Sequence, residues 1–318
     1  MLFAGIDIGA TNIKYGLVES GGEIKFRGKT ITPGNGLPNK LFEKIIYCAE
    51  QLLLEADDAN LSVGHLGVGS PGAINIKTGV VAGSCPNIPG WVGFHLRDRL
   101  SEHLNIPVFV DNDANCAGLA EFRFGAGQGY NNIICLTVGT GIGGGIILNG
   151  EIYHGSNYSA GEIGHTRIII DKSGGFESDI LESLVSSRAI LTRVKNGLES
   201  EMTPAFQNIL NGDMSRLTIR KVFRALKKGD KIAHDVISDS ARILGVALSG
   251  IVNLLNPEII IIGGGVAEGG YEFVDNVRET ILSECLPVAA ETLNIMPAQL
   301  GNDAGFIGAA FLGEGKKK

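Results

Sequence analysis

The chain alternates between short apolar runs bounded by glycine and longer stretches in which apolar residues recur every three or four positions. The short runs predict β-strands, and the longer stretches predict amphipathic helices. Strands are expected at Leu2–Ile8, Ile13–Val18, Glu23–Thr30, Gly64–Gly69, Val108–Asp111, Ile133–Val138, Ile142–Leu148 and Glu258–Ile262. Helices are expected at Lys40–Glu55, Phe94–Leu104, Asn112–Phe124 and Ala304–Leu312, and through most of 178–252. The glycine- and proline-rich zone from Ser70 to Trp91 is expected to form loops.

One strand-turn-strand pattern occurs twice, as FAGIDIGATNIKYGLV and as IICLTVGTGIGGGIIL, with Gly9 and Gly139 at the same point. Glycine lacks the Cβ atom that would keep a ligand away from the backbone amides of such a turn. A single turn of this kind is typical of a simple hairpin. Neither copy is a P-loop, and GIGGG does not open a helix as a dinucleotide fingerprint would. The repetition, however, predicts two copies of one unit that together grip a polyanion, as in an ATP-using enzyme.

The 318 residues are enough for two domains of ordinary size. Strands, crossover helices and the duplication predict an α/β fold with two like domains and a cleft between them. We place the domain boundaries at 1–117 plus 303–318 for a smaller N-terminal domain and at 118–302 for a larger C-terminal domain.

Composition narrows the choice of partners and location. The net charge of −7 argues against a nucleic-acid surface. Glycine or an acidic residue interrupts every apolar run before it reaches the length of a membrane span, and no signal segment opens the chain. The five cysteines lack paired spacing, which is typical of a reducing compartment. We therefore expect a cytoplasmic protein with a small-molecule substrate, bound neither to nucleic acid nor to a membrane.

Asp111, Asn112 and Asp113 stand between a predicted strand and a predicted helix. Helix capping, for which Asn and Asp are preferred, would explain one or two of them. Three in a row at the carboxyl end of a strand favour a further role. A carboxylate there can accept the proton of a substrate hydroxyl while the neighbouring amide orients that hydroxyl.

Glu162 and His165 form a second candidate pair within SAGEIGH. Their spacing of three residues places both side chains on one face of a helical turn, and the flanking glycines leave room for a ligand. A lone histidine is usually structural, but a carboxylate and an imidazole together can bind vicinal hydroxyls. Glu182 is ambiguous, because an acidic residue in the first turn of a helix usually compensates the helix dipole.

The chain resembles the ROK family of sugar kinases and repressors over nearly its whole length. The segments that carry the resemblance are GIDIGATNIKYGLV, GVGSPGAI, PNIPGW, VDNDANCAGLAE, TVGTGIGGGII, GSNYSAGEIGH, LESLVSSRAI, IIIIGGGV and LGNDAGFIGAA. The resemblance implies the actin-like ATPase fold of the hexokinase type, with two RNase H-like domains and with ATP and sugar meeting in the central cleft. It also suggests a homodimer.

The resemblance implies a role for each motif residue. Asp113 is similar to the family's catalytic base. The implied sugar ligands are Gly72, Asn87, Asn112, Asp113, Glu162, His165 and Glu182. The implied ATP and Mg²⁺ region comprises Asp7, Gly9, Thr11, Lys14, Thr137, Gly139, Thr140 and Gly141, with Gly264 and Gly265 near the adenosine.

One departure from the family pattern concerns zinc. Many members follow the GEIGH segment with a cysteine motif whose thiolates bind structural zinc together with the motif histidine. Here the corresponding stretch, TRIIIDKSGGFESDILES, contains no cysteine. Because His165 and nearby hydroxyls cannot form a closed tetrahedral site, we expect no structural zinc.

The sequence therefore predicts an ATP- and Mg²⁺-dependent hexose kinase acting on the 6-hydroxyl of glucose, with Asp113 as general base. Kinases of N-acetylmannosamine, N-acetylglucosamine or fructose remain open within the same family. A different class is a non-catalytic sugar-sensing regulator. The family's repressors carry a DNA-reading segment before the first phosphate strand, whereas here that strand is expected from Leu2. We therefore favour the kinase.

Overall fold

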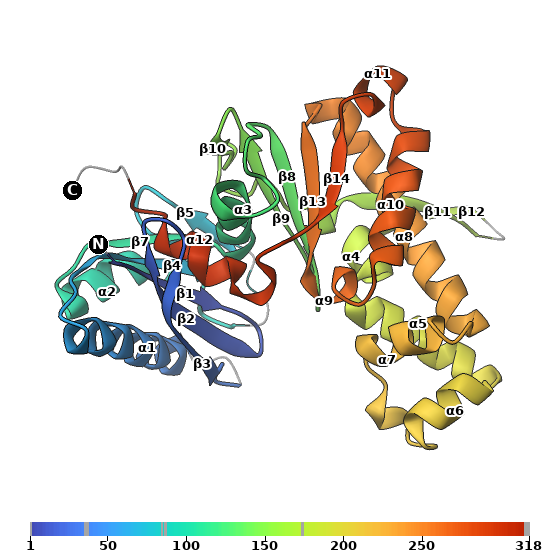
Figure 1. Cartoon of the computed structure of the whole chain (residues 1–318), viewed down its shortest axis with the longest axis horizontal. Helices are drawn as coiled ribbons and strands as arrows, with labels where there is room; N and C mark the ends of the chain where they lie inside the picture. The colour runs from blue at the N-terminus through green and yellow to red at the C-terminus, as the bar shows by residue number, and fades with distance from the viewer. Residues whose placement is uncertain (1, 35–37, 84, 86–87, 173–174, 315–318) are drawn as a thin grey trace. The chain divides into compact units, whose positions relative to one another are not determined.

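The computed structural model describes residues 2–34, 38–83, 85, 88–172 and 175–314 (Figure 1). The chain forms two compact units. The first unit comprises Met1–Asn131, Gly145–Gly161 and Leu300–Lys318, and the second comprises Asn132–Gly144 and Glu162–Gln299. Both units contain sheets and helices, so the predicted α/β class is confirmed.

The first unit is built on a five-stranded sheet with the order β3-β2-β1-β4-β7. Its strands are β1 (Leu2–Ile8), β2 (Asn12–Glu19), β3 (Ile24–Ile31), β4 (Val63–Ser70) and β7 (Val108–Asn112). The first three pair antiparallel, and β4 and β7 continue the sheet in parallel with β1. Helices cover both faces of this sheet.

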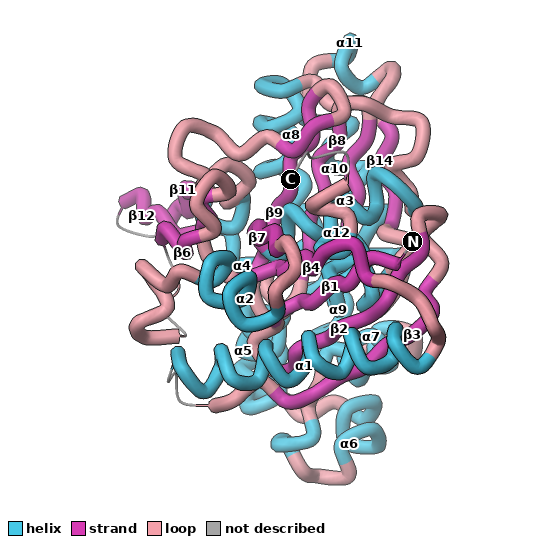
Figure 2. Tube along the Cα trace, turned by 90° about the vertical axis from the view of Figure 1, so that its left-hand side faces the viewer, coloured by secondary structure: helices cyan, strands magenta, loops and turns pink. Residues whose placement is uncertain are grey.

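Alternating side chains of these strands supply two separate cores. One face packs against α1 (Pro38–Asp58) and α2 (Leu96–Leu104), and α1 runs across the sheet in Figure 2. The other face packs against α3 (Asp113–Phe124) and α12 (Ala304–Ala310). The C-terminal segment thus returns to the first unit.

The contact between α12 and the sheet depends on a row of glycines. Gly16, Gly5 and Gly67 are direct neighbours in register on β2, β1 and β4. A Cβ atom added at Gly67 would lie 1.7 Å from the Ala309 carbonyl oxygen, and one at Gly5 would lie 1.9 Å from that of Phe306. The backbone of α12 therefore lies directly on the sheet, at a distance that only glycine allows.

The second sheet repeats the arrangement of the first. Its order is β10-β9-β8-β13-β14, so each strand has a counterpart in β3-β2-β1-β4-β7. The strands are β8 (Ile133–Val138), β9 (Ile142–Leu148), β10 (Glu151–Ile152), β13 (Ile259–Gly263) and β14 (Asn294–Pro297). β13 is parallel to both β8 and β14, as β4 is to β1 and β7. The predicted duplication is confirmed.

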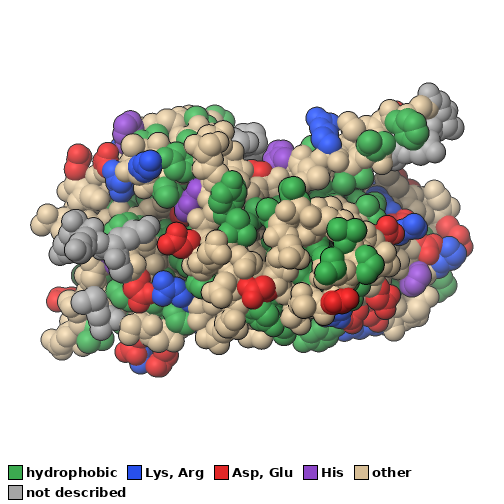
Figure 3. All heavy atoms as spheres, turned by 90° about the horizontal axis from the view of Figure 1, so that it is seen from above, with side chains coloured by type: hydrophobic (Ala, Val, Ile, Leu, Met, Phe, Trp, Pro, Cys, Tyr) green, Lys and Arg blue, Asp and Glu red, His purple; other side chains and the backbone are tan. Residues whose placement is uncertain are grey.

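Helices of the second unit enclose its single large core. The longest are α8 (Lys231–Leu255), α10 (Tyr271–Glu284) and α5 (Ser187–Ser200). The shorter ones are α4 (Leu181–Val185), α6 (Pro204–Leu210), α7 (Ile219–Leu226), α9 (Gly264–Ala267) and α11 (Pro287–Ala290). Among the helices described, none combines the length and the apolar character needed to cross a membrane. On the face drawn in Figure 3, acidic and basic side chains are interspersed with apolar ones.

The structure corrects the sequence-based elements in places where strands are short. The zone from Ser70 to Trp91 was expected to form loops, but it contains the hairpin β5 (Ala73–Asn75) and β6 (Val80–Gly83). A second hairpin, β11 (Arg167–Lys172) and β12 (Gly175–Ile180), occupies the stretch that replaces the zinc motif. Strands β10 and β14 were also missed. Two to six residues give too little periodicity to separate a strand from a loop.

The compact units also differ from the predicted domain boundaries. A boundary at 117 would cut through α3, which is continuous to Phe124 and packs along α12. The buried Glu121 also connects α3 to the segments that contain Ala126 and Leu300, because its carboxylate accepts hydrogen bonds from the amides of these two residues. The first continuous stretch of the first compact unit therefore extends to Asn131.

Candidate active site

Asp113 is the first residue of α3, directly after β7. Asn112 is the N-cap of α3, as the sequence pattern suggested for one of these residues. Its Oδ1 accepts hydrogen bonds from the amides of Ala114 (2.9 Å) and Asn115 (3.2 Å). With the cap provided by Asn112, Asp113 stands in the first turn of α3. The Ala114 amide also donates to Asp113 Oδ1 at 2.9 Å.

A buried hydrogen-bond network holds this strand-to-helix junction. Asp111 Oδ1 accepts from the Asn112 amide (2.7 Å) and from Asn115 Nδ2 (2.9 Å), and Asp111 Oδ2 lies 2.7 Å from His154 Nε2. Asp111 and Asn115 are both buried. His154 was not predicted as a site residue, because nothing in its local sequence pattern distinguishes it from other loop residues. Of the three polar residues, Asp111 is therefore structural, and it fixes the backbone that carries Asp113.

Two further predicted sugar ligands belong to the same unit. Asn112 Nδ2 donates to the Gly72 carbonyl oxygen at 3.2 Å, so Gly72 lies beside the capping residue. Gly72 has φ +89°, a conformation in which residues other than glycine are strained. Asn87 lies outside the described residues.

The first glycine turn joins β1 to β2 and is fixed from β3. The Gly9 amide donates to the Asn12 carbonyl (3.1 Å). The Thr32 hydroxyl donates to the Gly9 carbonyl (2.7 Å), and the Thr32 amide donates to the Thr11 carbonyl (3.0 Å). Because β1, β4 and β7 are parallel, this turn and Asp113 lie at the same edge of the sheet.

Asp7 and Lys14 are direct partners on β1 and β2, so their side chains share one face of the sheet. Burial raises the pKa of Asp7 to about 6, against the opposing effect of the Lys14 ammonium. Lys14 Nζ donates to the carbonyl oxygen (2.8 Å) and to Oδ1 (3.1 Å) of Asn302. The structure thus brings the predicted residues Asp7, Gly9, Thr11 and Lys14 together at one turn.

The second glycine turn joins β8 to β9. The Gly139 amide donates to the Gly141 carbonyl (2.8 Å), and the Gly139 carbonyl accepts from the Ser187 amide at the start of α5 (2.8 Å). Glu182 Oε2 accepts from the Ile142 amide at 2.8 Å, beside Gly141. A Cβ atom at Gly139 would meet nothing within 4 Å, so this turn is open where Gly9 is not.

Gly264 lies against the start of the second turn. It has φ +87°, and a Cβ atom there would lie 2.6 Å from the Val138 carbonyl oxygen. Thr137 is the register partner of Gly263. Thr137, Gly139, Thr140, Gly141, Gly264 and Gly265, all predicted for the nucleotide, therefore belong to one region of the second unit.

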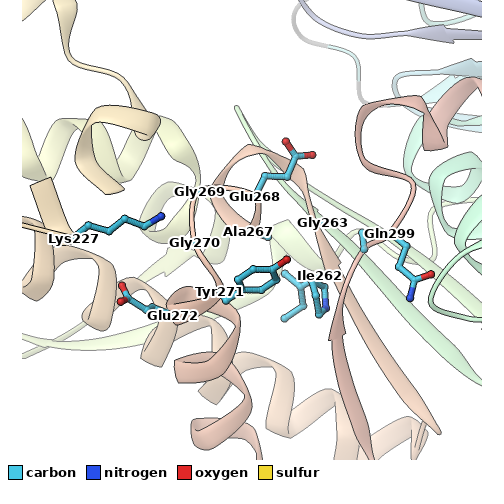
Figure 4. A pocket seen from close by; sticks show the side chains of 12 residues that line it. Lys227, Ile262, Gly263, Ala267, Glu268, Gly269, Gly270, Tyr271, Glu272 and Gln299 are labelled. Carbon is cyan, nitrogen blue, oxygen red and sulfur yellow. The ribbon is translucent and has the colours of Figure 1, made fainter. Parts of the chain in front are cut away.

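A cavity of ≈ 730 Å³ lies beyond Gly264 and Gly265 in the second unit. Its walls come from the end of β13, the segment from Ala267 to Glu272, residues 297–299 at and after the end of β14, and Lys227. Tyr271 presents its ring to the cavity close to Ile262 (Figure 4). An exposed aromatic ring beside apolar and backbone groups suits a planar heterocycle.

Glu162 and His165 also meet as predicted, at the start and end of a short 3₁₀ turn covering Ile163–His165. Glu162 Oε2 and His165 Nε2 are 4.0 Å apart, and both side chains are accessible to solvent. The Leu181 amide donates to the Thr166 carbonyl at 2.9 Å, which brings the first turn of α4, and with it Glu182, to this segment.

Within the described residues, no group of three or more His, Cys, Asp or Glu side chains could hold a metal by itself. Mg²⁺ does not require such a group, because it is usually bound through one or two carboxylates together with substrate phosphates. Asp7, a carboxylate beside the first glycine turn, fits this donor set. When bound, Mg²⁺ would neutralise phosphate charge at that turn. The absence of structural zinc stays a prediction.

Comparison with known proteins places the chain in a family. The ROK family profile matches residues 3–316. A glucokinase from Halalkalibacterium halodurans is 35% identical over 316 residues, covering 98% of this chain and 94% of the relative. A ROK family glucokinase from Streptomyces griseus, solved with glucose and AMPPNP, superposes with a TM-score of 0.83 at 31% identity, covering 98% and 99% of the two chains. A xylose repressor from Caldicellulosiruptor bescii is 28% identical and covers 96% of this chain and 76% of the repressor. The chain therefore belongs to the ROK family, and its resemblance to the sugar kinases of that family, with their two-domain actin-like ATPase fold, is confirmed.

Proposed function

We propose that this sugar kinase transfers the γ-phosphate of ATP to a hydroxyl of a hexose, with the 6-hydroxyl of glucose as the expected acceptor. The observation that carries the proposal is Asp113, held at the start of α3 while Asn112 provides the cap. A carboxylate held at this strand-to-helix junction can act as a proton acceptor. The similarity to glucokinases supports glucose as the first substrate to test.

The first unit supplies the base and part of the sugar and phosphate contacts in this proposal. Asp113 accepts the proton of the attacking hydroxyl, which makes the oxygen a better nucleophile. Asn112 and the Gly72 loop orient the sugar beside it. The amides around Gly9 and Thr11, together with Lys14, stabilise the charge that develops on the phosphates.

The second unit supplies the remaining sugar ligands and the nucleotide contacts. Glu162 and His165 are 4.0 Å apart and accessible, so they can bind neighbouring sugar hydroxyls. Glu182, already bonded to the Ile142 amide, connects the sugar ligands to the second turn. The open position at Gly139 leaves space for a phosphate, and the cavity near Gly264 suits the adenine.

An ADP-release assay tests the proposal and its alternatives. Purified protein with ATP and Mg²⁺ is offered glucose, mannose, fructose, N-acetylglucosamine and N-acetylmannosamine in turn. Glucose-dependent ADP release, with glucose 6-phosphate as product, supports the proposal. A preference for an N-acetylhexosamine or fructose would move the protein to another kinase of the family. Sugar binding without ADP release for any sugar would identify a non-catalytic sensor.

A further inference from the structure

Trp91 is the only tryptophan of the chain, and it is fully buried in the core of the first unit. Its ring stacks on that of Phe94, with the ring centroids 4.7 Å apart and an interplanar angle of 20°. The guanidinium of Arg99 lies over the Phe94 ring, 4.4 Å from its centroid. This packing accounts for the apolar body of the indole. It does not account for the indole N–H, which makes a specific hydrogen bond.

The indole N–H donates to the hydroxyl of Ser70, the last residue of β4. Trp91 Nε1 and Ser70 Oγ are 3.0 Å apart, and both residues are buried. The N–H is the single polar group of an indole and can only donate. The Ser70 hydroxyl therefore accepts this bond and keeps its own proton to donate, which it does to the Pro71 carbonyl oxygen at 3.2 Å. These two bonds form the Trp91–Ser70 relay.

The Trp91–Ser70 relay fixes one of the two peptide groups that flank Gly72. The Pro71 carbonyl belongs to the peptide before Gly72, and the Gly72 carbonyl, which accepts from Asn112 Nδ2 at 3.2 Å, belongs to the peptide after it. A proline followed by a glycine at φ +89° suits a type II turn, which differs from type I in the orientation of the peptide between these two residues. The relay therefore selects one orientation of that peptide.

Trp91 also holds the second loop that is proposed to contact the sugar. Its amide donates to the Ile88 carbonyl at 3.0 Å. Ile88 directly follows Asn87, the predicted sugar ligand that lies outside the described residues. At the other end, Ser70 is the register partner of Asn112, the N-cap of α3. Trp91 is thus connected to both loops and to the start of the helix that carries the proposed base.

We propose that Trp91 is a positioning residue for the sugar, and that it acts through the Ser70 hydroxyl by holding the Gly72 loop in the orientation that binds a hexose beside Asp113. The inference rests on the proposed kinase function. A loop that is already ordered binds the sugar without a further entropic cost and keeps the attacking hydroxyl in one place relative to the base. The nucleotide contacts should not depend on the relay, because other residues fix both glycine turns.

Steady-state kinetics of Trp91→Phe test the proposal. Phenylalanine keeps an aromatic ring that can stack on Phe94, but it removes the N–H and leaves the buried Ser70 hydroxyl without its donor. For an accepted sugar, kcat/KM should fall by about tenfold, the usual effect of one lost buried hydrogen bond, while the KM for ATP should stay within about twofold.

Phe42→Leu is the matched control. Phe42 packs in the same core, with its ring centroid 5.3 Å from that of Phe94, and it is not part of the Trp91–Ser70 relay. Its truncation should lower the melting temperature through lost packing and leave kcat/KM for the sugar unchanged. Thermal melts of both variants show how much stability each has lost, so an effect of general destabilisation is separated from an effect of the relay.

A second variant tests whether Trp91 acts through Ser70. Ser70→Ala removes the middle of the relay and should lower kcat/KM for the sugar at least as much as Trp91→Phe. The double variant should lose no more than Ser70→Ala alone, because residues that act through one bond do not contribute independently. The emission of the only tryptophan is a fold control, since in Ser70→Ala it should keep the short wavelength of a buried indole.

Four results would overturn the inference and leave Trp91 as a residue of the core alone. They are unchanged sugar kinetics in Trp91→Phe, an equal loss in Phe42→Leu, additive losses in the double variant, and an equal rise of the KM values for ATP and sugar. Each of them leaves the kinase activity of the unsubstituted chain in place. No turnover by the unsubstituted chain with ATP on any sugar would instead refute the proposed function.

Discussion

The two glycine turns share one backbone topology but differ in chemistry. Each joins an antiparallel pair whose first strand, β1 or β8, has a parallel neighbour on its other side. The first turn is fixed by Thr32 and is flanked by Asp7 and Lys14. The second is fixed by the start of α5 and by Glu182.

The duplication therefore repeats the strand order of the two sheets, whereas the residues that contact the two glycine turns differ. At Gly9 the missing Cβ makes room for the turn itself, because a Cβ there would lie 2.8 Å from the Asn12 carbonyl oxygen. At Gly139 it leaves open space. The same residue is therefore expected to serve folding in one turn and ligand access in the other.

The largest effect on turnover is expected at Asp113, because in the proposed mechanism only the first unit supplies a general base. Asp113→Asn keeps the size but removes the proton acceptor, so turnover should fall by roughly 10²–10⁴ with little change in sugar affinity. Glu182→Gln, in the other unit, should mainly raise the KM for sugar. Steady-state kinetics of both variants separate the two roles. A variant Asp113→Asn that keeps most of its turnover would remove Asp113 as the base.

The two glycines provide the direct test of the comparison. Gly139→Val should weaken ATP binding by at least about tenfold, the equivalent of one good contact, with the melting temperature little changed. Gly9→Val should also destabilise the fold by about 1–3 kcal/mol, because the side chain meets the Asn12 carbonyl. Calorimetry with ATP and thermal melts measure both effects. Unchanged nucleotide affinity in a folded Gly139→Val variant would make the second turn a simple hairpin.

A smaller effect is expected from the carboxylate beside the first turn. Burial raises the pKa of Asp7 from 3.8 to about 6, so the folded protein holds this proton more tightly than the unfolded chain. The stabilising contribution is therefore complete below about pH 4 and is lost as the pH rises through about 6.

Asp7→Asn should consequently raise the free energy of unfolding of the ligand-free protein near pH 7, by up to about 3 kcal/mol, while lowering kinase activity. The gain should disappear near pH 4. Urea unfolding across this range measures it. Glu182→Gln is the control in the second unit and should bring no gain, because the carboxylate accepts the Ile142 amide. A pH-independent difference for Asp7→Asn would contradict the burial argument.

The smallest effect concerns zinc. A chelator should leave the melting temperature unchanged within about 1 °C, because the segment between His165 and Glu182 offers no thiolate. The β11–β12 hairpin occupies this segment. Activity should be lost only through removal of Mg²⁺ and should return when Mg²⁺ is added. Elemental analysis that finds about one tightly held zinc per chain would point to ligands from elsewhere, with His154 as the first to examine.

Local pattern was enough to predict several of the long elements and the candidate residues within motifs, but it missed the 14-residue helix α10. The apolar runs of β1 and β8 and the periodic stretch of α1 were identified with ends within a few residues. The pairing of Glu162 with His165 also followed from spacing alone. His154 could not be predicted, because its partner Asp111 is 43 residues away and no local pattern connects them.

The sequence by itself determined the α/β class, the duplicated strand-turn-strand unit and the position of Asp113 at a strand end, because each depends on neighbours within a few residues. Only the tertiary structure decided which residues share a face. It placed Lys29 opposite Lys14 and aligned both with Asp7 and Asp111. It also set α12 on the row of Gly5, Gly16 and Gly67. Strand register and helix docking join segments far apart in the chain, and long-range packing, not local periodicity, selects among the possible pairings.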